Sequence, residues 1–145
     1  MKFTFEMDHI GVAVESLEKG KSFWEAIGLG PMTTETVASE KVNVGFFDLH
    51  DGVRIELLEP SEKDSPIAKF LEKKGPGIQQ ICFRVEDIRA TLKMLKSKGV
   101  QLINEEPRKG AHDCLVAFIH PKSTGGILIE LSQPNTLKGP VKGAK

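Results

Sequence analysis

A short apolar segment occurs twice in this chain, and the repeat limits what the chain can fold into. The segment Met7-Asp8-His9-Ile10-Gly11-Val12-Ala13-Val14 is echoed by Gln79-Gln80-Ile81-Cys82-Phe83-Arg84-Val85, at an offset of 71 positions. A second match pairs Val53-Arg54-Ile55-Glu56-Leu57-Leu58-Glu59-Pro60 with Ile127-Leu128-Ile129-Glu130-Leu131-Ser132-Gln133-Pro134, at an offset of 74 positions. Two matches in the same order indicate a tandem of two similar units.

The length and charge of the chain narrow the classes of protein it can belong to. A chain of 145 residues fits one compact domain, so two half-size units must share one core. The 20 basic and 20 acidic residues cancel, which argues against nucleic acid or a membrane as a partner. No apolar run has the length of a membrane span, and the N-terminus lacks a signal-peptide segment. With only Cys82 and Cys114, both predicted to be reduced core thiols, we expect a cytoplasmic protein.

Each unit carries the pattern β-α-β-β-β. Predicted helices begin after the N-caps Ser16 and Asp87 and end at Gly28 and Gly99. Their apolar faces consist of Leu17, Phe23, Trp24 and Ile27 in the first unit, and of Ile88, Leu92 and Leu95 in the second. The predicted strands span 7–14, 31–37, 42–49 and 53–59 in the first unit, and 79–85, 101–104, 114–119 and 127–132 in the second, with the weakest patterns at 31–37 and 101–104.

The sequence therefore predicts an α+β protein with one domain over residues 1–134. Module one covers about 6–62, and module two covers about 77–134. A helix at 65–74 links them, because Ser65-Pro66 is a favourable helix start and Gly75-Pro76-Gly77 ends it. Residues 135–145 have little apolar content and are predicted to form a flexible tail.

Four polar side chains are candidates for a metal site, since each is the polar member of an otherwise apolar strand. They form two equivalent pairs under the repeat, His9 with Gln80 and Glu56 with Glu130. If all four face one cavity, they offer one nitrogen and three oxygens to a divalent ion. A single strand histidine is more often an ordinary polar residue, and a single strand glutamate usually faces solvent. The residues alone leave both interpretations open.

The motifs resemble those of the vicinal oxygen chelate superfamily, and most closely its methylmalonyl-CoA epimerases. In that superfamily, paired β-α-β-β-β modules form a cup-shaped, partly open mixed sheet around a metal. The matching segments are Asp8–Val14, Ile55–Pro60, Asp64-Ser65-Pro66-Ile67-Ala68-Lys69-Phe70-Leu71, Gly77–Cys82, Gly110-Ala111-His112, His120-Pro121-Lys122-Ser123-Thr124-Gly125-Gly126 and Ile129-Glu130-Leu131.

One pair of residues departs from this resemblance. The epimerases usually have two adjacent histidines, the second a metal ligand, where this chain has Gln79-Gln80. Glyoxalase I, a relative, can use one glutamine, one histidine and two glutamates. The resemblance thus implies His9, Glu56, Gln80 and Glu130 as ligands of a divalent ion. Cobalt, nickel, manganese and magnesium suit these donors better than zinc.

The resemblance also implies a mechanism. Removal of the α-proton of methylmalonyl-CoA gives an enolate, which a metal can stabilise, and epimerisation needs one base on each face of the carbon. Glu130 matches one base of the family. Glu40 matches the other less well, and a solvated loop carboxylate is the simpler interpretation of it. His112 and Lys122 lie in family-like loops and are candidates for substrate contact.

Three functions follow from the sequence. The first is the epimerase, a homodimer in common with its family, acting on an acyl-CoA thioester. The second is a lactoylglutathione lyase of the glyoxalase I type, which acts on a glutathione adduct. The third is a metal-free small-molecule binding protein, in which Gln80 would be a lost ligand. The His120–Gly126 segment favours the epimerase over the lyase.

Overall fold

A computed structural model describes residues 2–135, which divide into two compact units. One unit comprises residues 9–79, and the other comprises residues 80–135 together with the N-terminal residues up to Asp8. Of the predicted tail, residues 136–145 lie outside the described residues. Among the described helices, none is long and apolar enough to cross a membrane.

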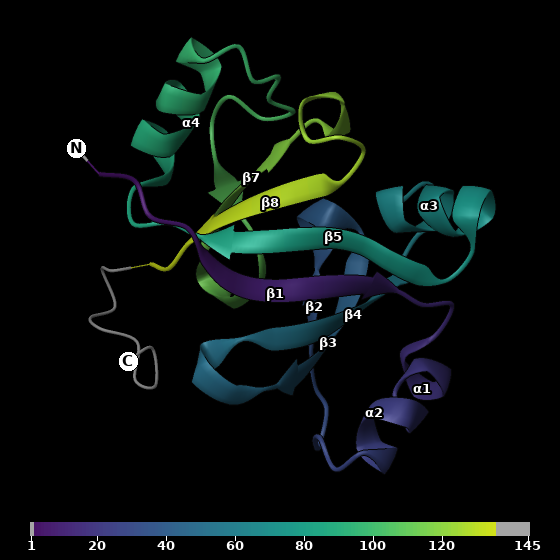
Figure 1. Cartoon of the computed structure of the whole chain (residues 1–145). Helices are drawn as coiled ribbons and strands as arrows, with labels where there is room; N and C mark the ends of the chain where they lie inside the picture. The colour runs from purple at the N-terminus through teal and green to yellow at the C-terminus, as the bar shows by residue number, and fades with distance from the viewer. Residues whose placement is uncertain (1, 136–145) are drawn as a thin grey trace. The chain divides into compact units, whose positions relative to one another are not determined.

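The unit of residues 9–79 contains one complete β-α-β-β-β pattern and the linking helix (purple to teal in Figure 1). Its strands are hydrogen-bonded in the order β2-β3-β4-β1, with β1 and β4 parallel and the other neighbours antiparallel. The elements in chain order are β1 (Glu6–Ala13), α1 (Leu17–Gly20), α2 (Ser22–Ala26), β2 (Thr33–Val37), η1 (Ala38–Glu40), β3 (Val42–Asp48), η2 (His50–Gly52), β4 (Arg54–Pro60) and α3 (Pro66–Lys74).

The second unit repeats this plan with a shorter strand. Its strands are hydrogen-bonded in the order β5-β8-β7-β6, and β5 and β8 are the parallel pair. The elements in chain order are β5 (Gly77–Arg84), α4 (Ile88–Ser97), β6 (Arg108–Lys109), η3 (Ala111–Asp113), β7 (Leu115–Ile119), η4 (Pro121–Ser123) and β8 (Leu128–Gln133). The two predicted β-α-β-β-β modules are confirmed.

The repeat extends to the register of the parallel strands. His9 pairs with Arg54 and Gly11 with Glu56 in the first unit. At the same offsets, Gln80 pairs with Leu128 and Cys82 with Glu130 in the second. Each candidate ligand of one module therefore has its equivalent at the same place on the same strand of the other module.

The start of each first helix is anchored in the same way in both modules. Glu59, at the end of β4, accepts a hydrogen bond from the backbone N–H of Leu17 at 2.9 Å. Gln133, at the end of β8, accepts one from the N–H of Ile88 at 2.7 Å. The first N–H groups of a helix have no partner within it, so a side chain from the parallel strand satisfies one of them. This contact fixes the helix against its strand.

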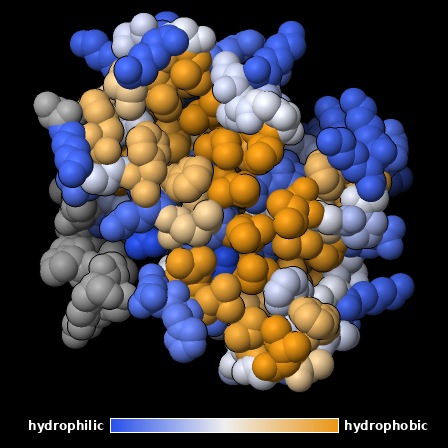
Figure 2. Space-filling model, in the orientation of Figure 1, coloured by the Kyte–Doolittle hydropathy of each residue, from blue (hydrophilic) through white to orange (hydrophobic). Residues whose placement is uncertain are grey.

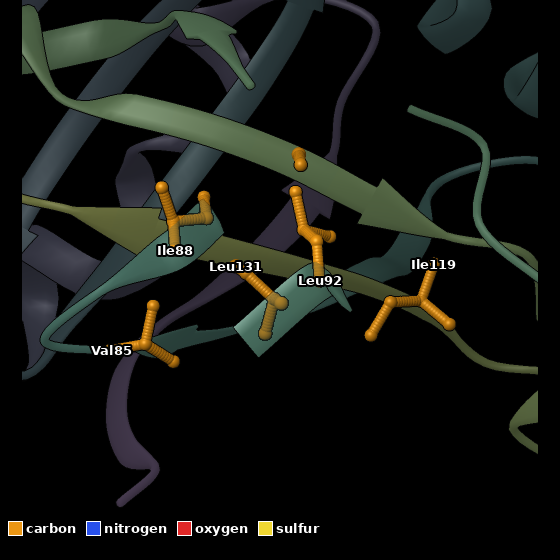
Figure 3. Close-up of a cluster of buried hydrophobic side chains, with 6 residues drawn as sticks. Val85, Ile88, Leu92, Ile119 and Leu131 are labelled. Carbon is orange, nitrogen blue, oxygen red and sulfur yellow. The ribbon is translucent and has the colours of Figure 1, made fainter. Parts of the chain in front are cut away.

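Apolar side chains pack between helix and sheet in both units. Figure 3 shows side chains from α4, β7, β8 and Val85 gathered into one buried cluster, which consists of Val85, Ile88, Leu92, Ala117, Ile119 and Leu131. The equivalent cluster of the first unit consists of Val14, Phe47, Ile55 and Leu57, with Leu17 and Trp24 among the side chains packed against it. These clusters use the strand faces opposite to the candidate ligands, as the alternation predicts.

The predicted apolar face of the first helix is partly wrong. The helix is divided into α1 and α2 around Lys21, and Phe23 and Ile27 are 61% and 56% exposed. Figure 2 shows hydrophobic side chains over α2, at the bottom of the view. With about 100° per residue, Phe23 and Ile27 lie roughly 80–120° around the helix from Leu17, whereas Trp24 lies almost on the same line. Only Leu17 and Trp24 therefore reach the core.

The predicted strand at 101–104 is also wrong. This segment makes one isolated bridge, between Leu102 and Ile119, and the regular strand β6 comes later. The side chain of Asn104 accepts the backbone N–H of Phe118 at 2.9 Å. A side-chain oxygen thus accepts the backbone N–H that a regular β-ladder would pair with a backbone carbonyl.

Candidate active site

The first pair of candidate ligands lies on the parallel strands β1 and β4. His9 and Glu56 are 4% and 3% exposed, and His9 Nδ1 lies 3.1 Å from Glu56 Oε2. The register explains the contact, because Glu56 is two residues beyond Arg54, the direct partner of His9. Side chains two positions apart on a strand share a face, so the imidazole and the carboxylate meet on the face opposite the apolar cluster.

Arg54 contacts the same carboxylate, and the sequence did not identify it as a site residue. Its Nη2 and Nε donate to Glu56 Oε2 at 2.8 and 3.2 Å. The guanidinium carbon also lies 5.8 Å from the centre of the Phe46 ring, within the range of a cation–π contact. The signal that could have identified Arg54 is the Arg-x-Glu spacing on one strand, because it places the two side chains on the same face.

The second pair lies on β5 and β8, at the equivalent positions. Gln80 and Glu130 are 7% and 8% exposed, and Gln80 Nε2 donates to Glu130 Oε1 at 2.6 Å. The repeat predicts that His9 is equivalent to Gln80 and Glu56 to Glu130, and the two observed contacts, His9 with Glu56 and Gln80 with Glu130, are equivalent in the same way. The convergence of the two pairs on one ion stays a prediction.

The donors within each unit fit a divalent ion. Neighbouring ligands on an octahedral ion with bonds of about 2.1 Å lie about 3 Å apart. The 3.1 Å between His9 Nδ1 and Glu56 Oε2 is compatible with this spacing, and it is equally the length of a hydrogen bond between the two side chains. The amide of Gln80 must turn so that its oxygen replaces its nitrogen, because an N–H₂ group cannot coordinate a cation. Imidazole, amide and carboxylate donors together suit ions that accept both nitrogen and oxygen.

Glu40, the second candidate base, is the last residue of η1, just before β3. It is half-buried, and its Oε2 atom is shielded from solvent. This burial argues against a solvated loop carboxylate, the simpler interpretation of the sequence. Its neighbour Lys41 has a left-handed backbone, with a φ of 55°, and its carbonyl accepts the N–H of Ser61 at 3.0 Å.

An ion pair adds a second link between η1 and the segment before α3. Lys41 Nζ donates to Asp64 Oδ2, and this hydrogen bond raises the pKa of Lys41 and lowers the pKa of Asp64. Asp64 begins the Asp64–Leu71 motif. Part of that motif therefore helps to hold the loop that carries Glu40.

A family model for the glyoxalase/bleomycin resistance protein/dioxygenase superfamily matches residues 8–118. The chain belongs to this superfamily. Members of the superfamily typically bind a divalent metal ion.

The relatives within the superfamily include epimerases. The chain is 42% identical to the mitochondrial methylmalonyl-CoA epimerase of Homo sapiens over 130 residues, 88% of this chain and 73% of that protein. It is 36% identical to the solved methylmalonyl-CoA epimerase of Mycobacterium tuberculosis, with a TM-score of 0.86 over 93% of this chain and 92% of that one. A Streptomyces coelicolor epimerase variant in complex with 2-nitronate-propionyl-CoA is 33% identical, with a TM-score of 0.84 over 90% and 96% of the two chains.

These similarities confirm the resemblance inferred from the sequence. They also show that the chain has the vicinal oxygen chelate fold.

Two loops resemble those of the epimerases within this superfamily, the loop of His112 and the loop of Lys122, and different contacts stabilise them. His112 and Asp113, in η3, both have left-handed backbones, with φ of 57° and 58°. Asp113 accepts from Asn135 at 3.0 Å and lies 3.1 Å from Lys109 Nζ. Non-glycine residues in this region are strained, and such strain is often found at functional sites. A role of His112 in binding substrate stays a prediction.

The loop of Lys122 is stabilised by its own side chains. The ring Nδ1 of His120 accepts the backbone N–H of Lys122 at 3.0 Å, and Thr124 Oγ1 accepts that of Ile127 at 3.0 Å. The Lys122 side chain is exposed, so it can reach a ligand from this loop. That contact also stays a prediction.

Proposed function

We propose that the chain is a metal-dependent epimerase that interconverts the two C2 epimers of methylmalonyl-CoA. The observation that carries this proposal is the similarity to methylmalonyl-CoA epimerases, at 42% identity over 88% of this chain in one case and a TM-score of 0.86 in another. The three relatives named above are all epimerases, which favours this function over the lactoylglutathione lyase.

Two residues of the chain can be assigned to the proton transfers of this reaction. The α-carbon of methylmalonyl-CoA lies between a thioester and a carboxylate, so a carboxylate base can remove its proton. Inversion requires that a second group return a proton to the other face. We assign these two roles to Glu130, on β8, and Glu40, in η1.

His9, Glu56, Gln80 and Glu130 would hold the divalent ion. When bound, such an ion supplies Lewis-acid stabilisation of the negative charge that develops on the substrate oxygens. Cobalt, nickel, manganese and magnesium remain the expected ions, ahead of zinc, because three of the four donors are oxygens.

The hydrogen bond between Gln80 and Glu130 gives Gln80 two roles. In the structure, its N–H donates to the carboxylate at 2.6 Å. With an ion, its oxygen would ligate, and the cation would offset the repulsion between that oxygen and the carboxylate. Ligation through the amide oxygen of Gln80 would therefore replace this buried hydrogen bond, at a cost on the order of 1 kcal/mol.

We expect Gln80→His to bind the ion more tightly than the original chain. Imidazole is a stronger donor than an amide oxygen, and no amide has to rotate. Competition with a chelator measures the change, with Gln101→His as the control for an added histidine at an exposed position. Unchanged or weaker binding by Gln80→His would show that Gln80 is not a ligand.

Solvent exchange tests the reaction directly. The metal-loaded protein should exchange the α-proton of methylmalonyl-CoA with deuterium and interconvert the two epimers, because both follow from reversible proton removal. The glutathione hemithioacetal of methylglyoxal, offered in parallel, should not be converted. The reverse outcome would establish the lyase instead. No turnover of either, together with no metal uptake, would favour the metal-free binding protein.

The structure weakens one argument against that metal-free alternative. Buried carboxylates are costly without a cation, but Arg54 already supplies a positive charge to Glu56. Metal content therefore has to be measured rather than inferred from charge balance. The homodimer and the cytoplasmic location stay predictions, and light scattering of the purified protein tests the first of them.

A further inference from the structure

Arg54 breaks the symmetry between the two modules. At the offset of 74 positions that relates Glu56 to Glu130, the equivalent of Arg54 is Leu128. Both residues occupy the same register position, Arg54 opposite His9 and Leu128 opposite Gln80. Only one of the two equivalent glutamates therefore has an arginine two residues before it on its own strand.

The geometry of Arg54 is that of a side chain held in place. Two of its nitrogens reach the same oxygen of Glu56, and its guanidinium lies over the Phe46 ring. Phe46 is directly opposite Glu56 in the β3–β4 ladder and is almost fully buried. The side chain of Arg54 is 20% exposed, so water screens the ion pair only in part. Ring and carboxylate together leave the guanidinium few other orientations.

We propose that Arg54 is a positioning residue for the metal site, which fixes the orientation of the Glu56 carboxylate. A carboxylate on a flexible side chain turns about its last bond, and two N–H donors on one oxygen restrict that rotation. This inference rests on the proposed metal site, with Glu56 as a ligand. At the equivalent position module two has Leu128, and there the Gln80 amide contacts Glu130.

Two effects of Arg54 on metal binding oppose each other. Orientation favours binding, because hydrogen-bond partners of metal ligands typically contribute about 10- to 100-fold to affinity. The charge of Arg54 disfavours binding, since it repels a divalent ion. The repulsion acts on the ion across the intervening carboxylate and weakens with that distance, whereas the hydrogen bonds act on the carboxylate at contact distance. Orientation should therefore dominate.

The test compares cobalt affinity, by competition with a chelator, in four proteins. These are the original chain, Arg54→Leu, Arg54→Lys and the control Arg89→Leu. The first variant installs the residue that module two has at this position. Arg89 is exposed and pairs only loosely with Glu106 at 3.9 Å, so the control removes the same charge far from Glu56 along the chain.

We expect Arg54→Leu to bind cobalt about 10- to 100-fold more weakly, Arg54→Lys to be intermediate, and Arg89→Leu to be unchanged. The visible spectrum of bound cobalt should also change in Arg54→Leu, because it reports ligand geometry and not stability. Equal or tighter binding by Arg54→Leu would overturn the proposal. If that variant does not fold, full affinity and an unchanged spectrum in Arg54→Lys would overturn it. Failure of the original chain to bind cobalt would instead contradict the metal site itself.

Discussion

Glu130→Gln should impair both metal binding and epimerisation, because we propose that this one carboxylate is both a ligand and a base. The substitution keeps the shape of the side chain and removes its charge. We expect turnover to fall by about a hundredfold or more, as for other positioned acid–base groups. Metal affinity should fall in parallel by about tenfold or more, since even indirect partners of ligands contribute that much. Chelator competition and the epimerisation rate at saturating metal measure the two effects separately.

The control for this experiment is Glu106→Gln, which removes the same charge from a side chain that is 86% exposed. It should leave both quantities unchanged. Thermal unfolding of the metal-free proteins shows whether Glu130→Gln is folded. Loss of turnover with full metal affinity would keep Glu130 as a base but remove it from the ligand set.

Glu40→Gln should separate the two functions. We expect metal affinity to stay nearly the same, because Glu40 is not among the proposed ligands. Epimerisation should fall by about a hundredfold or more, since one face of the α-carbon loses its acid–base group. Exchange with deuterium from the other face should survive, because Glu130 is still present. Mass spectrometry of each epimer separately detects this one-sided exchange.

Glu72→Gln is the matched control, since Glu72 is an exposed glutamate of α3 in the same unit. Normal epimerisation by Glu40→Gln would exclude Glu40 from the mechanism. Loss of exchange at both faces of the α-carbon would show that Glu40 serves both faces, or that its loop positions the substrate against Glu130.

The repeat made most of the fold predictable. Two β-α-β-β-β patterns related by offsets of 71 and 74 positions predict that equivalent strands pair alike. The registers of β1–β4 and β5–β8 agree with this residue by residue. Helix starts were predictable for a different reason, because Ser16, Ser65 and Asp87 are N-caps with local hydrogen bonds. Such signals depend on neighbours in sequence, which are visible without the structure.

The errors arose where distant contacts override a local pattern. The apolar residues at 101–104 suggested a strand, but a bond from Asn104 to β7 interrupts the ladder. Phe23 and Ile27 suggested a buried face, but only one stripe of a short helix can touch the sheet. Neither a hydrogen bond between a side chain and a distant strand nor the rotation of a helix can be inferred from composition or periodicity alone.

The candidate residues of the site were predictable, but their contacts were not. Strand alternation and the repeat identified His9, Glu56, Gln80 and Glu130 as candidates, and the structure places His9 against Glu56 and Gln80 against Glu130. The contact of Arg54 with Glu56 and the direction of the Gln80 amide depend on side-chain torsions. Those torsions are set by packing, for example by the Phe46 ring, and sequence spacing does not encode them.

The shared register of the two modules has an evolutionary consequence. Because His9 and Gln80 occupy equivalent positions, two point mutations can move the histidine from module one to module two. The path Gln80→His and then His9→Gln passes through a chain with histidine at both positions. Every step along it keeps at least one imidazole and both glutamates. A duplicated fold of this kind lets natural selection move a ligand from one half to the other without passing through an ancestor that has lost its donor set.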